Sequence, residues 1–244
     1  MVPRERAEKA RALMLELFPE GFEESESADG LELAAYTDAA GEERLWATFG
    51  RGASEPVLAG WEERWRDFHR PVRIGPLWIG PPWEPPDGDL AVTIDPGRAF
   101  GTGAHPTTRL CLELLLELEP TSLVDVGCGS GVLAVAAAKL GFDPVIALDH
   151  DPAATEAAAR NAEANSVVLD VRAQDAFSAE LPFAHVTVAN VTGDLVRRLA
   201  PSLRSDALIG SGYLEFDAPT LQGFARMERR TAQGWAADLF RREE

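Results

Sequence analysis

The stretch VDVGCGSGVLAVAAAKLG, from Val124 to Gly141, joins an apolar strand, a glycine-rich turn and an amphipathic helix without a break. Its three glycines, Gly127, Gly129 and Gly131, allow a tight turn and the close approach of a ligand, because no Cβ is in the way. The helix that follows presents free backbone N–H groups and the positive end of its dipole at the turn. By itself the pattern also fits an ordinary strand-to-helix turn. The residues around it are needed to distinguish a ligand-binding loop from such a turn.

A second apolar strand, from Pro144 to Leu148, follows the helix and ends in Asp149. Asp149 stands about 20 residues beyond the glycines, where doubly wound folds place the acidic residue that binds ribose hydroxyls. The glycine spacing is G-x-G-x-G, and Val132 occupies the place of the last glycine of a dinucleotide motif. The sequence therefore favours a nucleoside cofactor and disfavours an NAD-dependent oxidoreductase.

The glycine loop, with the acidic Asp125 two residues ahead of it, resembles the first motif of class I methyltransferases. This resemblance implies a Rossmann-like α/β fold and S-adenosylmethionine as the cofactor. That cofactor has no phosphates, which agrees with the lack of a P-loop Lys-Ser/Thr pair in the turn.

Composition limits the classes of partner. The 244 residues are 45% hydrophobic and 26% charged, which is ordinary for a globular protein with one large core or two modest domains. A net charge of −17 disfavours direct nucleic-acid binding and favours a basic protein, unless it serves only solubility. No apolar stretch approaches the ~20 residues of a membrane span, and no signal-peptide core is present, so we expect a cytoplasmic protein without a membrane partner. Cys111 and Cys128 lack disulfide or metal-ligand spacing, so they are expected to be buried free thiols, and we expect no metal site.

We expect a small α+β domain at 1–80, a proline-rich linker at 81–88 and an α/β domain at 89–244. The first domain should hold a helix at 4–18, strands at 31–37 and 44–49, and a helix that packs Trp61, Trp65 and Phe68. In the second domain the expected strands are 90–94, 122–126, 144–148, 167–171, 185–190 and 207–211, and the expected helices are 107–118, 132–140, 152–165 and 194–199. This alternation predicts a mostly parallel sheet with helices on both faces, and a ligand site at the carboxyl ends of its strands.

The segment FGTGAHPTT, from Phe100 to Thr108, makes the resemblance more specific. Together with the glycine loop it resembles the PrmA family, which methylates protein eleven of the large ribosomal subunit. The resemblance continues through Asp149 to Asn165 and upstream to the tryptophan region. In that family the first segment closes over the cofactor, which implies cofactor-side roles for Gly101, Thr102, Gly103, His105, Thr107 and Thr108.

Asn190 ends the strand VTVAN, and an Asn at this place in similar methyltransferases lies beside the target nitrogen. Its side-chain carbonyl could accept a hydrogen bond from an amine and orient the lone pair, which makes Asn190 the candidate catalytic residue. Alternatively, Asn190 caps the helix that follows it. Gln174 and Asp175 follow the strand at 167–171, where such folds bind adenine by analogy. The candidate cofactor-binding residues are Thr102, Gly103, His105, Thr107, Asp125, Gly127, Gly129, Gly131, Asp149, Gln174, Asp175 and Asn190.

The chain departs from the family pattern in two places. Val191-Thr192-Gly193 follows Asn190, where the family usually continues with an aliphatic residue and Leu-Ala. The N-terminal domain has only Val2-Pro3 ahead of its first helix, and residues 50–59 make a poor second helix, so either a first strand is missing from a misassigned start or the docking domain is reduced.

The resemblance implies an S-adenosylmethionine-dependent protein N-methyltransferase, expected to be a monomer, that modifies lysine or N-terminal amines of ribosomal protein eleven. No general base stands out, so solvent could take the amine proton. The alternatives are a methyltransferase for another protein or a small amine, and a non-catalytic cofactor-binding module. A DNA adenine methyltransferase is poorly supported, because no Pro-Pro-aromatic sequence follows Asn190.

Overall fold

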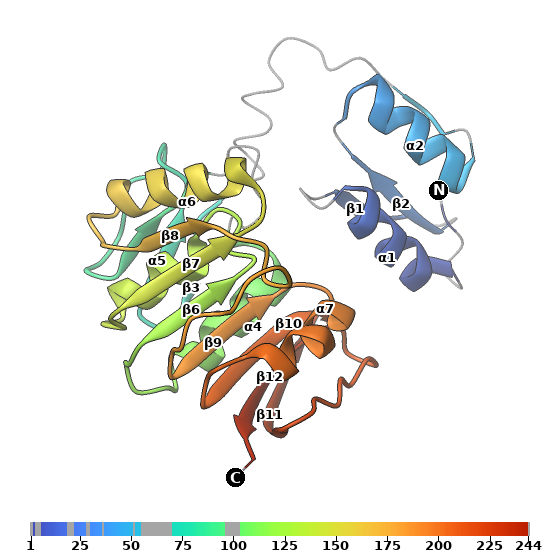
Figure 1. Cartoon of the computed structure of the whole chain (residues 1–244). Helices are drawn as coiled ribbons and strands as arrows, with labels where there is room; N and C mark the ends of the chain where they lie inside the picture. The colour runs from blue at the N-terminus through green and yellow to red at the C-terminus, as the bar shows by residue number, and fades with distance from the viewer. Residues whose placement is uncertain are drawn as a thin grey trace. The chain divides into compact units, whose positions relative to one another are not determined.

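A computed structural model describes residues 2, 6–18, 22–27, 30–35, 37–50, 52–54, 70–95 and 103–243 of the chain. The chain divides into two compact units, Met1–Trp65 and Arg66–Glu244. Figure 1 shows the elements of each unit.

The first unit contains two helices and a two-stranded antiparallel sheet. Its elements are α1 (Ala7–Leu17), β1 (Glu23–Ser27), β2 (Gly30–Ala34) and α2 (Ala39–Phe49). Met14 of α1 and Leu31 of β2 are buried. Val2 forms an isolated antiparallel bridge with Leu31, in which each backbone N–H donates to the other's carbonyl, over 2.7 and 2.8 Å. The α+β character expected of this region is confirmed.

The strand expected at 44–49 is wrong, because these residues form the second half of α2. The helix begins at a side-chain cap: the Asp38 carboxylate accepts a hydrogen bond from the Gly41 N–H over 2.9 Å. Leu45, Trp46 and Phe49 are partly buried, a spacing that suits one helix face better than one strand face. The unit thus has a second helix, which lies ahead of residues 50–59, the segment expected to make a poor one. The expected helix around Trp61 and Trp65 lies outside the described residues.

The second unit begins with a three-stranded sheet in the order β3-β4-β5, formed by β3 (Val72–Ile74), β4 (Leu77–Gly80) and β5 (Ala91–Thr93). β4 pairs with β5 in parallel. Residues 81–88, expected as a linker, therefore connect two paired strands of one sheet, and the boundary between the compact units falls between Trp65 and Arg66.

A seven-stranded sheet forms the centre of the second unit, in the order β11-β12-β10-β9-β6-β7-β8. β12 runs antiparallel to both of its neighbours, and the other pairs are parallel. The strands are β6 (Leu123–Val126), β7 (Val145–Asp149), β8 (Asp170–Ala173), β9 (Val186–Asn190), β10 (Ala207–Leu214), β11 (Phe224–Ala232) and β12 (Trp235–Arg242). The expected mostly parallel α/β sheet is confirmed, and it also includes β11 and β12, which the sequence analysis did not predict.

Helices cover both faces of this sheet (Figure 1). They are α4 (Pro106–Leu115), α5 (Val132–Lys139), α6 (Pro152–Ala164) and α7 (Gly193–Leu199). α4, α5 and α6 contact one another in sequence along one face, whereas Val196 and Leu199 of α7 pack on the other face against Val124, Leu208 and Phe240.

β8 begins later than the strand expected at 167–171. Ser166 adopts a positive φ of 55°, and the Val167 N–H donates to the Ala162 carbonyl over 3.1 Å. The turn that ends α6 therefore extends to Val167, and Val168 is 91% exposed. Among the helices that the structure describes, none is long and apolar enough to cross a bilayer.

Candidate functional site

The carboxyl ends of four parallel strands place the candidate residues at one edge of the sheet. β6 leads into the glycine loop, β7 ends at Asp149, β8 is followed by Gln174, and β9 ends at Asn190. The chain moves from β6 to β7 on one side and returns as β9 on the other side of β6. Such a switch point opens a crevice outside the strand ends, where open α/β sheets bind ligands.

All three glycines of the loop adopt positive φ, with values of 75° for Gly127, 53° for Gly129 and 80° for Gly131. Side chains other than glycine are strained in this region. Space is also short, because a Cβ on Gly131 would lie 2.9 Å from the Ala158 Cβ and one on Gly127 would lie 2.7 Å from Val191 Cγ1. The loop thus combines a turn that requires glycine with close packing against α6 and the segment after β9.

Asp149 is buried and holds the loop from the next strand. One carboxylate oxygen accepts the Gly129 N–H and the other accepts the Asp151 N–H, each over 3.0 Å. A carboxylate has about four acceptor positions, so both oxygens keep capacity for further donors. This geometry suits a pair of ribose hydroxyls, the role expected for Asp149.

Asp125 lies inside the sheet and is 1% exposed. Within the described part of the chain, neither carboxylate oxygen has a hydrogen-bond partner of good geometry. Burial raises the pKa of Asp125 to about 7, opposed by the Ala134 backbone N–H and reinforced by the charge of Asp149. A buried carboxylate of this kind favours a nearby cationic ligand group, such as the ammonium of an amino acid.

His105 and Thr107 lie at the start of α4. The His105 side chain caps the helix, because its Nδ1 accepts the Thr107 N–H over 3.3 Å and lies 2.7 Å from the Thr107 hydroxyl. Its ring also meets the Trp235 ring edge-on, with centroids 5.0 Å apart. Burial lowers the pKa of His105 to about 4, so the imidazole is neutral at pH 7. These contacts explain His105 as a helix cap and leave its expected contact with the cofactor as a proposal.

Asn190 is joined to α4 at the edge of the sheet. Its amide nitrogen donates to the buried Thr108 hydroxyl over 3.3 Å. Among the described residues, no group donates a hydrogen bond to the Asn190 Oδ1. The capping alternative does not fit, because the N-cap of α7 is Thr192 and the helix has no side-chain cap hydrogen bond. The geometry therefore favours a role toward a ligand.

Gln174 and Asp175 lie beside the end of β7. The Gln174 backbone N–H donates to the Asp149 carbonyl over 2.8 Å, and its side chain donates to the Glu180 carbonyl over 3.3 Å. The Asp175 carboxylate accepts the Phe177 N–H over 2.9 Å, which closes a turn. The structure thus places Gln174 next to Asp149, and Asp175 follows it in a turn.

Gly103 adopts a φ of 82°, and a Cβ there would lie 2.6 Å from Ile79 Cγ2. It therefore packs against β4, which is a structural reason for glycine at this position. Gly101 and Thr102 lie outside the described residues. Cys111 and Cys128 are buried free thiols, as expected, and burial raises the pKa of both above the usual range.

Two asparagines of α6 support the site and were not singled out by the sequence analysis. Asn161 donates to the Ser130 carbonyl of the glycine loop over 2.8 Å and accepts the Asp95 N–H over 3.0 Å. Asn165 pairs with the backbone of Thr93, accepting its N–H over 2.8 Å and donating to its carbonyl over 2.6 Å. Their spacing of four residues on an alanine-rich helix was the available signal.

Comparisons with known proteins agree with this geometry. A family model described as ribosomal protein L11 methyltransferase (PrmA) matches residues 22–237. The ribosomal protein L11 methyltransferase of Vibrio parahaemolyticus serotype O3:K6 is 42% identical over 185 residues, covering 69% of this chain and 61% of that protein. The protein of the same name from Heliobacterium modesticaldum is 38% identical over 201 residues, covering 75% of this chain and 64% of that protein. The chain thus spans somewhat less than two thirds of the length of these relatives.

A solved structure shares the fold. The crystal structure of ribosomal protein L11 methylase from Lactobacillus delbrueckii subsp. bulgaricus superposes with a TM-score of 0.64 at 26% sequence identity. The match covers 72% of this chain and 100% of that chain. Together with the strand order, this match identifies the seven-stranded sheet as a class I methyltransferase fold.

Proposed function

The chain belongs to the ribosomal protein L11 methyltransferase (PrmA) family, and from this premise we propose that it transfers a methyl group from S-adenosylmethionine to amine nitrogens of ribosomal protein L11. The target nitrogens are lysine side chains, the N-terminal amine, or both. One observation supports the proposal most directly. The side chain of Asn190 is anchored to Thr108 through its nitrogen, which leaves its carbonyl oxygen as an acceptor at the ligand edge of the sheet.

The residues present fit the cofactor of this family. Asp149 retains acceptor capacity for ribose hydroxyls beside a loop of three glycines with positive φ. Asp125 is a buried carboxylate without a partner of good geometry in the described chain, which matches the positive amino end of the cofactor. S-adenosylmethionine supplies an electrophilic methyl group on sulfur. We assign its binding to Asp125, the glycine loop, Asp149, Gln174 and Asp175, with Gly103, His105 and Thr107 on the α4 side. We extend the assignment to Thr102, on the resemblance alone.

The chain's own contribution to the reaction is alignment. Asn190 accepts a hydrogen bond from the neutral amine and so directs its lone pair, and positioning of this kind can supply a large part of a rate enhancement. His105 is a weak proton acceptor, because burial lowers its pKa to about 4. We therefore assign the departing amine proton to water.

The partner follows from the same premise. A ribosomal protein that binds RNA is typically basic, and the net charge of −17 would attract such a substrate. We propose that the enzyme acts as a monomer in the cytoplasm, on the ribosomal protein and without direct contact to nucleic acid. The first unit is proposed to dock this substrate.

The test is transfer of radiolabelled methyl from S-adenosylmethionine to ribosomal proteins extracted from cells that lack this enzyme. We expect label on L11 with the wild-type chain and a loss of about a hundredfold with Asn190→Ala, because the amine loses its orienting acceptor. Affinity for S-adenosylhomocysteine, measured by calorimetry, should change little in that variant. Label on another protein or a small amine would replace L11 as the substrate. Cofactor binding without label on any acceptor would favour a non-catalytic module.

A further inference from the structure

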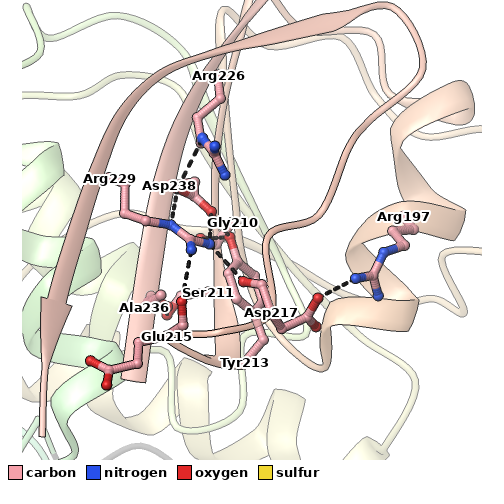
Figure 2. A network of polar contacts seen from close by, with 10 residues as sticks. All are labelled: Arg197, Gly210, Ser211, Tyr213, Glu215, Asp217, Arg226, Arg229, Ala236 and Asp238. Carbon is pink, nitrogen blue, oxygen red and sulfur yellow. Dashed lines mark hydrogen bonds and ion pairs between the residues drawn. The ribbon is translucent and has the colours of Figure 1, made fainter. Parts of the chain in front are cut away.

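A network of polar side chains on β10, β11 and β12 centres on the buried Asp238 (Figure 2). Asp238 of β12 is 0% exposed and accepts two hydrogen bonds from Arg229 of β11, each over 2.8 Å. The Tyr213 hydroxyl lies 2.8 Å from the same carboxylate and 2.8 Å from the Gly210 carbonyl. A fully desolvated carboxylate is costly unless its partners satisfy it, and these partners do.

The network extends to the segment that follows β10. The Arg229 guanidinium also donates to the backbone carbonyl of Glu215 over 2.9 Å and to that of Asp217 over 2.7 Å. One guanidinium thus joins a buried carboxylate to two carbonyls of an otherwise irregular segment. This arrangement fixes the position of the Asp217 backbone.

The Asp217 side chain continues the network to α7, the helix that begins just after Asn190 (Figure 2). Its carboxylate accepts a hydrogen bond from Arg197, which also donates to Asp194 over 2.9 Å. The other oxygen of Asp217 lies so close to Gly193 that a Cβ there would be 2.6 Å away. Gly193, one of the departures from the family pattern, thus lies directly beside the Asp217 carboxylate.

Val191, the residue after Asn190, is confined from two sides. A bulge in β10 between Ser211 and Tyr213 brings Gly212 against it, and a Cβ on Gly212 would lie 1.8 Å from the Val191 carbonyl oxygen. On the other side the Val191 side chain packs against Gly127 of the cofactor loop. The segment 191–193 therefore lies between the glycine loop and the end of β10 with the residues that follow it, which Arg229 holds in place.

We propose that Asp217 is a positioning residue for methyl transfer: through Arg197 and Gly193 it holds the segment after Asn190, and so holds the Asn190 carbonyl toward the acceptor amine. This inference rests on the proposed function. Asp217 does not contact the reacting atoms. Its removal should therefore reduce turnover while cofactor affinity is kept.

The test compares Asp217→Asn with the matched control Asp206→Asn. The control removes the same charge from an exposed carboxylate that lies 2.6 Å from His185 Nδ1, at the amino end of β10, the opposite end from Asp217. In hydrogen exchange without ligand, we expect amides of 191–199 to exchange about tenfold faster in Asp217→Asn only. We expect turnover on L11 to fall about tenfold, because small misplacements at a reacting centre are costly. The dissociation constant of S-adenosylhomocysteine should stay within about twofold.

A second variant, Arg197→Gln, removes the other half of the ion pair. It should reproduce both changes, and the double variant should add little to either single one, because the two residues act through one contact. Unchanged exchange in 191–199, or faster exchange with full turnover, would overturn the proposal. An equal loss of cofactor affinity and turnover would also overturn it, because the network would then be merely structural. Failure of the proposed function is seen separately, as a wild-type chain that transfers no methyl to L11.

Discussion

Asp149 combines two tasks in one side chain. It accepts the Gly129 N–H of the loop and the Asp151 N–H of its own segment, and its remaining acceptor positions are assigned to ribose. Hydrogen bonds to a charged group each contribute about 1.5 to 3 kcal/mol. Asp149→Ala should therefore weaken the binding of S-adenosylhomocysteine by about a hundredfold or more, measured by calorimetry.

The neighbouring Asp151→Ala is the control for this prediction. Asp151 caps α6, because its carboxylate accepts the Ala153 N–H over 2.9 Å. Its loss should lower the free energy of unfolding by about 1 kcal/mol and leave cofactor affinity unchanged. An Asp149→Ala variant that binds as tightly as the wild type would remove our map of the cofactor site.

Asp125 makes stability depend on pH. Its pKa is raised from 3.8 to about 7, so between these values the folded chain binds more protons than the unfolded chain. The protonated Asp125 therefore contributes its full stability below pH 3.8, the ordinary pKa of Asp. This contribution falls as pH rises above 3.8 and is lost once pH passes about 7. Relative to Asp125→Asn, the ligand-free wild type should lose on the order of 4 kcal/mol between pH 4 and pH 8.

Urea unfolding of both proteins across this pH range measures the difference. His105 also makes stability depend on pH, because its pKa is lowered and the stability it contributes is lost as pH falls from 6.5 through about 4. Both proteins contain His105, so its effect cancels in the difference between them. Parallel stability curves for the two proteins would show that Asp125 ionises normally.

At the scale of elements, α6 connects the site to the three-stranded sheet. Asn165 is 6% exposed and satisfies both the N–H and the carbonyl of Thr93 in β5. Truncation of this side chain leaves two backbone groups without partners. Asn165→Ala should therefore lower the free energy of unfolding by about 2 to 4 kcal/mol, measured by urea denaturation.

Glu163→Ala, an exposed change on the same helix, is the control and should stay within about 0.5 kcal/mol of the wild type. If the two variants were equally stable, the contact between α6 and β5 would carry little energy.

Elements with strong local signals were predicted, and those that depend on distant partners were not. The glycine loop, Asp149 and the end of β9 stand out because positive φ and a polar residue after an apolar strand are local features. In α2, the short sequence RLWATF suits either a strand or a helix, and the cap at Asp38 decides. β11 has the sequence FARMERRTA, whose charged residues do not alternate with apolar ones as in a typical strand. Its Arg229 pairs with Asp238 of β12, a contact that the local sequence does not indicate.

The position of the candidate site is a property of the whole second unit. Its residues come from the start of α4 and from the ends of several strands. They lie together because the parallel strands have their carboxyl ends at one edge of the sheet, and because β7 and β9 lie on opposite sides of β6. The network of Asp238 and Arg229 belongs to β12 and β11, two antiparallel strands that extend the sheet beyond β10. Sequence distance therefore says little about which residues support the site.

The division into two compact units predicts that cofactor binding and substrate docking can be separated. The second unit, Arg66–Glu244, contains the seven-stranded sheet, its core and all of the candidate cofactor residues. A variant that lacks residues 1–65 should therefore bind S-adenosylhomocysteine within about threefold of the full chain. Methyl transfer to L11 should fall by about a hundredfold, because the docking surface assigned to the first unit is lost.

Calorimetry and the labelled-methyl assay on the same two preparations separate these effects, and the far-ultraviolet circular dichroism of the shortened chain checks that it is folded. Full transfer by the shortened chain would place substrate recognition in the second unit, beside Asn190. A loss of cofactor affinity equal to the loss of transfer would mean that the second unit depends on the first to form its site. The expected result, retained binding with little transfer, would assign alignment of the methyl group to the second unit and choice of the protein substrate to the first.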